Sequence, residues 1–103
     1  MYRKLKSYAK VFEMVTMTIE LKGYGFRINI SGESYFIKDN GDSFVLAEEV
    51  GREATNFVDD KYTNMGVNNI KELLCQLVTQ PNETLGLLGI KSEPIEKVVV
   101  EYS

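Results

Sequence analysis

A strict alternation of apolar and polar side chains between residues 15 and 22 constrains the fold of this chain more than any other feature. The apolar members are Val15, Met17, Ile19 and Leu21, and the polar members are Thr16, Thr18, Glu20 and Lys22. A period of two is the repeat of a β-strand, whose successive side chains point to opposite faces of a sheet. The segment therefore predicts a strand with one face buried and the other in water.

The residues that follow repeat this pattern between turn signals. The apolar positions of the next segment are Phe26, Ile28 and Ile30, and its polar positions are Arg27 and Asn29. "SGES" then separates this segment from "YFIK", and "DNGD" separates "YFIK" from "SFVL". Within "DNGD", Asn40-Gly41 favours a type I′ turn, in which both central residues have positive φ. These patterns predict four antiparallel strands in a meander.

The C-terminal segment "EKVVVEY" predicts one more strand. Its side chains divide into Val98, Val100 and Tyr102 on one face and Lys97, Val99 and Glu101 on the other. We expect this strand to join the sheet and to leave an exposed edge, which could serve assembly with other subunits. The preceding "NETLGLLGI" predicts a capped single turn or a tight apolar loop.

Two longer segments show the helical period instead. From Ala47 to Tyr62 the apolar positions are Val50, Ala54, Phe57 and Val58, joined by the stem of Lys61. This spacing predicts a helix of about four turns. A second helix is predicted after Asn69, because Asn69 and Glu72 have the spacing of a capping box, and Pro81 ends it. Its apolar positions are Ile70, Leu73, Leu74, Leu77 and Val78.

The resulting fold prediction is a single α+β domain over residues 1–103. It has an antiparallel sheet of about five strands, formed by the meander and the C-terminal strand, packed against two main helices. A short basic helix precedes them at residues 1–12, with Tyr2, Leu5, Ala9 and Phe12 at helical spacing and Arg3, Lys4, Lys6 and Lys10 around them. No apolar run approaches the roughly 20 residues of a membrane span, and one cysteine, Cys75, agrees with a reducing compartment. We therefore expect a cytoplasmic protein without membrane contact.

The composition excludes most catalytic arrangements. The chain has no histidine and one cysteine, which rules out His-based catalysis, His-ligated zinc and thiolate clusters. "DNGD" does not form a calcium loop of the EF-hand kind, because the sixth position counted from Asp39 is Phe44 and the twelfth is Val50. Paired carboxylates remain among Glu48, Glu49, Glu53, Asp59 and Asp60, but a chain this short can hardly enclose a deep cleft. We predict a protein without enzymatic activity, metal or cofactor.

The string "KGYGF", residues 22–26, resembles the first five positions of the RNP1 motif of RNA-recognition motifs and cold-shock domains. The resemblance implies a single-stranded nucleic-acid platform formed by Lys22, Tyr24, Phe26 and Arg27. Parity favours a different interpretation, because Tyr24 and Phe26 would share a face with Ile28 and Ile30. We therefore expect a hairpin turn followed by core residues, and keep nucleic-acid binding as the alternative.

The helix predicted after Ala47 carries a line of acidic residues. At 100° per residue, Glu49, Glu53 and Asp60 fall on one side of that helix, beside Asn56. Such a line is either a solvated face or a surface that meets a basic groove on a protein partner.

The functional prediction is a non-enzymatic binding protein that acts by protein contact through these four residues. A small acidic domain of this composition suits a phage or mobile-element inhibitor or modulator of a nucleic-acid enzyme. A structural or assembly subunit, including a homo-oligomer, is the third alternative.

Overall fold

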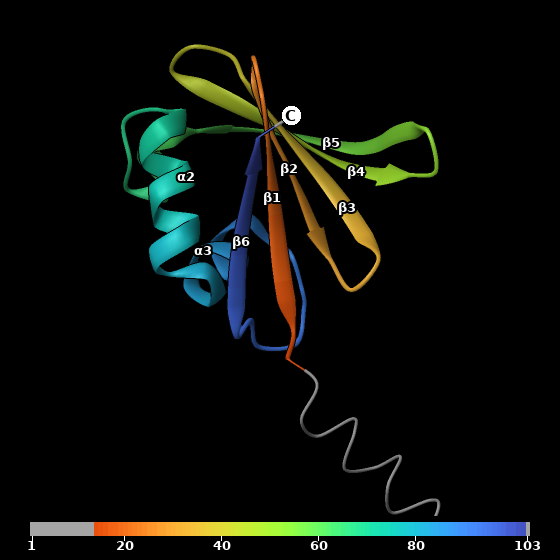
Figure 1. The fold of residues 1–103 in the computed structure, drawn as a ribbon. Coiled ribbons are helices and arrows are strands. Elements are labelled where there is room, and N and C mark those ends of the chain that lie inside the picture. Colours follow the sequence, from red (N-terminus) through yellow and green to blue (C-terminus); the bar gives the residue numbers. More distant parts are fainter. Residues whose placement is uncertain (1–13, 103) are drawn as a thin grey trace, which may run out of the picture.

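The computed structural model describes residues 14–102, which form one six-stranded sheet with two α-helices against one face (Figure 1). The strands are β1 (Thr16–Lys22), β2 (Gly25–Ile30), β3 (Glu33–Asp39), β4 (Ser43–Val50), β5 (Glu53–Lys61) and β6 (Lys97–Tyr102). A short 3-10 helix, η1 (Tyr62–Met65), leads from β5 to the helices α2 (Ile70–Thr79) and α3 (Pro81–Leu88). The predicted α+β class is therefore confirmed.

The predicted meander is present as β1 to β4. Ile19 pairs with Ile28, and Ile28 pairs in turn with Tyr35, so the apolar members of the alternating segments share one face. We call this the covered face, because α2 and α3 pack on it, and we call the face of Glu20 and Arg27 the open face. The largest side chains of the sheet core, Met17, Ile19, Phe26, Ile28, Ile37 and Phe44, are almost completely buried on the covered face. The period-two prediction is confirmed for these strands.

The sheet differs from the prediction in strand number and in direction. Its strand order is β5-β4-β3-β2-β1-β6, so the sheet contains six strands and not about five. β6 joins the sheet as predicted, but it runs parallel to β1, with Met17 beside Val98 and Ile19 beside Val100. The sheet is therefore mixed and not antiparallel. A parallel neighbour requires a long crossover, and the segment with α2 and α3 provides it.

The helix predicted from Ala47 to Tyr62 is wrong. This segment consists of the end of β4, a two-residue turn, β5 and Tyr62, the first residue of η1. The turn consists of Gly51 and Arg52 between the paired Val50 and Glu53, and Gly51 has a φ of 66°. A glycine with positive φ favours a turn over a continuous helix, and pairing with β4 satisfies the backbone of β5. The apolar spacing that indicated a helix was coincidental.

The turn types also differ from the prediction. Among the described residues, Ser31 is the one non-glycine with positive φ, at 49°, and Gly32 follows at 84°. These two residues with positive φ form the turn that joins β2 to β3 at the start of "SGES". At "DNGD" only Gly41 has positive φ, and the amide of Asn40 donates to the carbonyl of Ser43 across 2.8 Å. The predicted hairpin is present there, but it is not a type I′ turn.

The helix predicted after Asn69 is confirmed as α2. Oδ1 of Asn69 accepts from the backbone amide of Glu72 at 3.0 Å, and Oε2 of Glu72 accepts from the amide of Asn68 at 2.6 Å. The segment predicted as a single turn or loop is instead the eight-residue helix α3, which begins at Pro81 and ends at Leu88, with Gly89 as its C-cap. The predicted N-terminal helix lies outside the described residues. Within residues 14–102, neither helix has the length and apolar character to cross a membrane.

Candidate functional site

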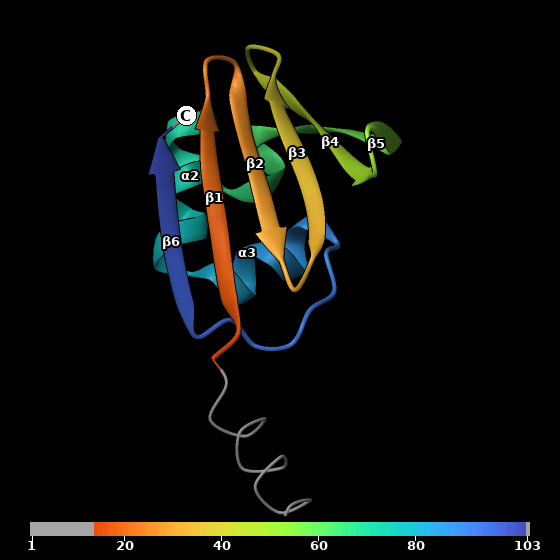
Figure 2. The ribbon, with the colours of Figure 1, turned by 45° about the vertical axis from the view of Figure 1, so that its right-hand side comes forward.

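The β4–β5 hairpin carries the most exposed apolar side chains of the sheet apart from the turn residue Tyr24 and the terminal Tyr102. Val50 is 63% exposed, Phe57 is 66% exposed and Val58 is 53% exposed. Figure 2 shows that β4 and β5 turn away from the plane of β1, β2 and β3, and Figure 1 shows their free end pointing away from α2 and α3. The helices that bury the covered face elsewhere therefore do not cover this end of the hairpin.

A β-bulge interrupts the pairing of β4 and β5 beside Phe57. Leu46 pairs with Val58 and Glu48 pairs with Thr55, so one residue of β4 stands opposite two residues of β5. A bulge breaks the alternation of faces and increases the local twist of the strand. Ala47 therefore lies opposite Asn56 and Phe57, while Val58 next to them pairs regularly with Leu46. Phe57 and Val58 are both exposed. Both residues belong to the apolar stripe of the helix predicted from Ala47 to Tyr62, and their exposure contradicts the predicted burial.

The four residues predicted to bind a partner all lie on this hairpin, but they do not form one line. Glu49 lies on β4 and pairs with Ala54 on the open face, whereas Glu53 pairs with Val50 and Asp60 pairs with Phe44 on the other face. Asn56 lies on β5 within the bulge. The hairpin brings the predicted residues onto one element, and the register divides them between its two faces.

Glu49 is already engaged within the protein. The guanidinium of Arg27 donates from Nε to Oε1 of Glu49 at 3.0 Å and lies 3.4 Å from Glu20 through Nη1. Lys22 Nζ lies 2.6 Å from Oε1 of Glu20. The hydrogen bond to Glu49 raises the pKa of Arg27, and the hydrogen bond from Lys22 lowers the pKa of Glu20. These four side chains form one charge network across β1, β2 and β4 on the open face.

The residues of "KGYGF" do not form a common platform. Phe26 is 2% exposed on the covered face, as expected for a core residue. Tyr24 lies in the β1–β2 turn, is 60% exposed and has its ring centre 5.7 Å from that of Phe36. Lys22 and Arg27 belong to the charge network just described. The expected shared face of Tyr24 and Phe26 is absent, because the strand begins only at Gly25.

Two cavities lie beside the helices. The first, of about 330 Å³, lies between the β1–β2 turn and the start of α2 and includes Lys22, Asp39 and Leu74 in its lining. Its Asp39 accepts hydrogen bonds from the Tyr62 hydroxyl at 2.7 Å and from the Gly41 amide at 3.1 Å.

The second cavity, of about 460 Å³, lies beside α3 and includes Asn82. The side chain of Asn82 binds the backbone of Ile95 through both its oxygen, at 2.7 Å, and its nitrogen, at 3.3 Å. Asp39 and Asn82 therefore stabilise the fold at these two cavities, and neither cavity is assigned a ligand.

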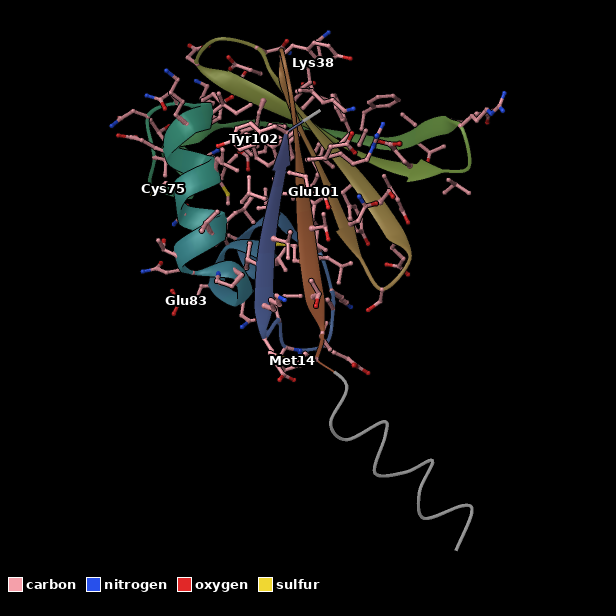
Figure 3. The ribbon with its side chains drawn as sticks, in the orientation of Figure 1. Met14, Lys38, Cys75, Glu83, Glu101 and Tyr102 are labelled. Atoms are coloured by element: carbon pink, nitrogen blue, oxygen red, sulfur yellow. The ribbon has the colours of Figure 1, made fainter. Side chains whose placement is uncertain are left out.

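The part of the chain that the structure describes contains no group of three or more acidic or cysteine side chains arranged to hold a metal ion. Cys75 lies exposed on α2 (Figure 3). Comparison of the chain with protein-family models, with curated proteins and with solved structures finds no match.

The site residues that sequence reasoning missed are Val50, Phe57 and Val58. The available signal was Gly51-Arg52 between two segments rich in β-branched and aromatic residues, which is a hairpin pattern. The bulge had no recognisable sequence signal, because it depends on how β5 pairs with β4.

Proposed function

We propose that this protein works by binding another protein, without catalysis, through the hairpin surface. This hairpin surface covers both faces of the hairpin, because Val58 and Asp60 pair with Leu46 and Phe44 whereas Asp59 pairs with Val45. Its members are the apolar Val50, Phe57 and Val58 and the acidic Glu53, Asp59 and Asp60. The observation that supports the proposal is the exposure of more than half of each of the three apolar side chains on one projecting hairpin. Exposed apolar groups with a polar surround are typical of protein interfaces, in which an aromatic residue often contributes most of the affinity.

The acidic surround indicates the chemistry of the partner. Glu53 and Asp59 are exposed, and the chain has a net charge of −3. A partner surface that complements the hairpin has an apolar pocket for Phe57 with basic side chains around it. A groove that otherwise holds nucleic-acid phosphates has such basic groups, so the proposal includes inhibition or modulation of a nucleic-acid enzyme. The acidic surround favours a protein partner over nucleic acid, because it repels phosphate.

Affinity capture from the native host with matched variants tests this proposal. Phe57→Ser removes the central aromatic, and Leu87→Ser on α3 is the control, because Leu87 is 58% exposed and far along the chain from the hairpin. We expect a partner retained by the parent protein and by Leu87→Ser, and bound at least about tenfold more weakly by Phe57→Ser. Equal retention by Phe57→Ser and the parent would place the contact elsewhere.

The acidic residues have a separate test with the captured partner. The double variant Glu53→Gln and Asp59→Asn should slow association and reduce its dependence on salt, because exposed charges act mainly on the association rate. Unchanged rates and an unchanged salt dependence would limit the contact to the apolar residues.

A further inference from the structure

The sheet has two edge strands, β5 and β6, and they differ in how well they could accept another strand. β5 contains the bulge between Thr55 and Val58, and a bulge is one of the devices that discourage edge pairing. β6 follows β1 residue by residue from Lys97 to Tyr102 without a register shift. Its other side has no neighbouring strand within the described part of the sheet, and Figures 1 and 2 show it as the outermost strand. The regular edge is therefore the edge of β6.

The sequence of β6 complements itself in the antiparallel direction. It reads Lys97, Val98, Val99, Val100, Glu101 and Tyr102. If two copies pair about a twofold axis at Val99, Lys97 of each copy faces Glu101 of the other, and Val98 faces Val100. Opposite charges and β-branched side chains directly across an antiparallel pair both stabilise it. Two ion pairs then enclose a block of six valines.

In this register, paired residues of the two β6 strands lie on matching faces of their sheets. Val98 lies beside Met17 and Val100 beside Ile19, so both point to the covered face. Lys97 and Glu101 lie beside Thr16 and Glu20 on the open face, where charged ends can meet in contact with water. Val98 is already half-buried, while Val100 is 36% exposed. Pairing would extend the apolar layer of the covered face from one copy to the next.

Neighbouring registers lack this complementarity. A shift of one residue in one direction sets Glu96 against Glu101, a pair of like charges, which is destabilising. A shift of one residue in the other direction sets Lys97 against Tyr102 and Glu101 against Val98, without an ion pair. Of these three registers, only the one centred on Val99 pairs both charged residues of β6 with opposite charges. The complementarity therefore specifies one register and identifies the partner strand as β6 of a second copy.

We propose that the protein forms a homodimer in which two β6 strands pair in antiparallel direction about Val99 and join the two sheets into one. Such a symmetric contact closes on itself and leaves no further β6 edge free. It does not rest on the hairpin surface, because β5 lies at the opposite edge of the sheet. The dimer therefore carries one hairpin surface at each far end and can bind a repetitive or dimeric partner at two points.

Charge exchange tests the dimer. Lys97→Glu sets Glu against Glu twice, and Glu101→Lys sets Lys against Lys twice, so each variant alone should dimerise about tenfold more weakly than the parent or remain monomeric. An equal mixture of the two variants should recover dimers, because the carboxylate introduced at position 97 of one copy then faces the ammonium group introduced at position 101 of the other. Lys91→Glu and Glu93→Lys are the controls, since both residues are exposed in the segment before β6. Sedimentation over a concentration series measures the dissociation constants.

Cysteine cross-linking tests the register. In a Cys75→Ser background, Val99→Cys places two cysteines directly opposite each other, and mild oxidation should give a covalent dimer. Val100→Cys faces Val98 of the other copy and should cross-link far less.

Four outcomes would overturn the proposal. They are a parent protein that stays monomeric, an equal effect of the control charge changes, failure of the mixed variants to associate, or cross-linking through position 100 in place of position 99. A monomeric parent that still binds its partner through Phe57 would overturn the dimer and leave the proposed function intact. A dimer whose partner binding is unaffected by Phe57→Ser would do the reverse.

Discussion

The hydroxyl of Tyr62 donates a hydrogen bond to Oδ1 of Asp39 across 2.7 Å and so ties the end of β5 to the β3–β4 turn. Tyr62 is fully buried, and its ring centre lies 5.2 Å from that of Phe44. The same oxygen of Asp39 accepts the amide of Gly41. Asp39 is the first acidic residue of "DNGD", a string that resembles a calcium loop in the sequence. In the structure, Asp39 links the β3–β4 turn to the residue that follows β5.

This contact predicts a loss of stability in alkali. Burial first, and then the hydrogen bond to Asp39, raise the pKa of Tyr62 above its ordinary value of 10.0. A raised pKa in the folded state means that the neutral phenol stabilises the fold below pH 10, and that this contribution is lost as the pH rises further. Tyr62→Phe should therefore lose less stability than the parent between pH 9 and pH 11, measured by thermal unfolding. Tyr24→Phe, at an exposed tyrosine, should follow the parent, and an equal loss in Tyr62→Phe would contradict the assignment.

The two glycines of "KGYGF" should respond differently to substitution. A Cβ atom on Gly25 would lie 1.9 Å from the backbone oxygen of Ile37, whereas a Cβ atom on Gly23 would meet nothing within 4 Å. Since a backbone oxygen in a paired strand cannot rotate away, Gly25→Ala should lower the free energy of unfolding by about 1–3 kcal/mol or more. Gly23→Ala is the matched control and should change it by less than about 0.5 kcal/mol. Urea unfolding of both variants checks this, and equal effects would show that β2 and β3 can separate at Gly25.

Two acidic residues of the hairpin, Glu49 and Glu53, should contribute differently to the free energy of unfolding. Glu49 has a side chain only 19% exposed and accepts the hydrogen bond from Arg27, whereas Glu53 is exposed next to the hairpin turn. Glu49→Gln should lower the free energy of unfolding by about 1 kcal/mol, because it weakens a charge-assisted hydrogen bond in partly buried surroundings. Glu53→Gln should leave the free energy of unfolding nearly unchanged. Denaturant unfolding at neutral pH distinguishes them, and a neutral Glu49→Gln would mean that the charge network adds nothing to stability.

The start of α2 gives a fourth prediction. Asn69→Ala removes the side chain that accepts the amide of Glu72, and it should cost about 1 kcal/mol of folding free energy. Asn68→Ala is the control, because Asn68 binds Glu72 through its backbone amide, which alanine retains. Hydrogen exchange in the first turn of α2 should accelerate in Asn69→Ala and not in Asn68→Ala. Acceleration in both variants would indicate that the helix end depends on solvent exposure and not on the cap.

Local patterns were sufficient for much of the fold. The alternation in β1 and β2, the cap of α2 at Asn69 and the break at Pro81 each depend on side chains within a few residues of one another. Such signals act in the same way in any tertiary surroundings. They predicted the α+β class, the four-strand meander, the helix after Asn69 and the C-terminal strand.

The candidate site was the part that the sequence did not reveal. The residues Val50, Ala54, Phe57 and Val58 have a spacing compatible with a helix, and their actual structure depends on pairing with β4. The sequence determined which residues carry the acidic and apolar character of this segment, namely Glu49, Glu53 and Asp60 beside Phe57.

Only the tertiary structure decided that the hairpin register divides these acids between two faces and that β6 runs parallel to β1. It also decided that Tyr62 lies in the core and reaches Asp39. The physical reason is that strand pairing and burial are contacts between segments distant in sequence. Their free energy depends on what each segment meets in the folded chain and not on the pattern of the segment alone.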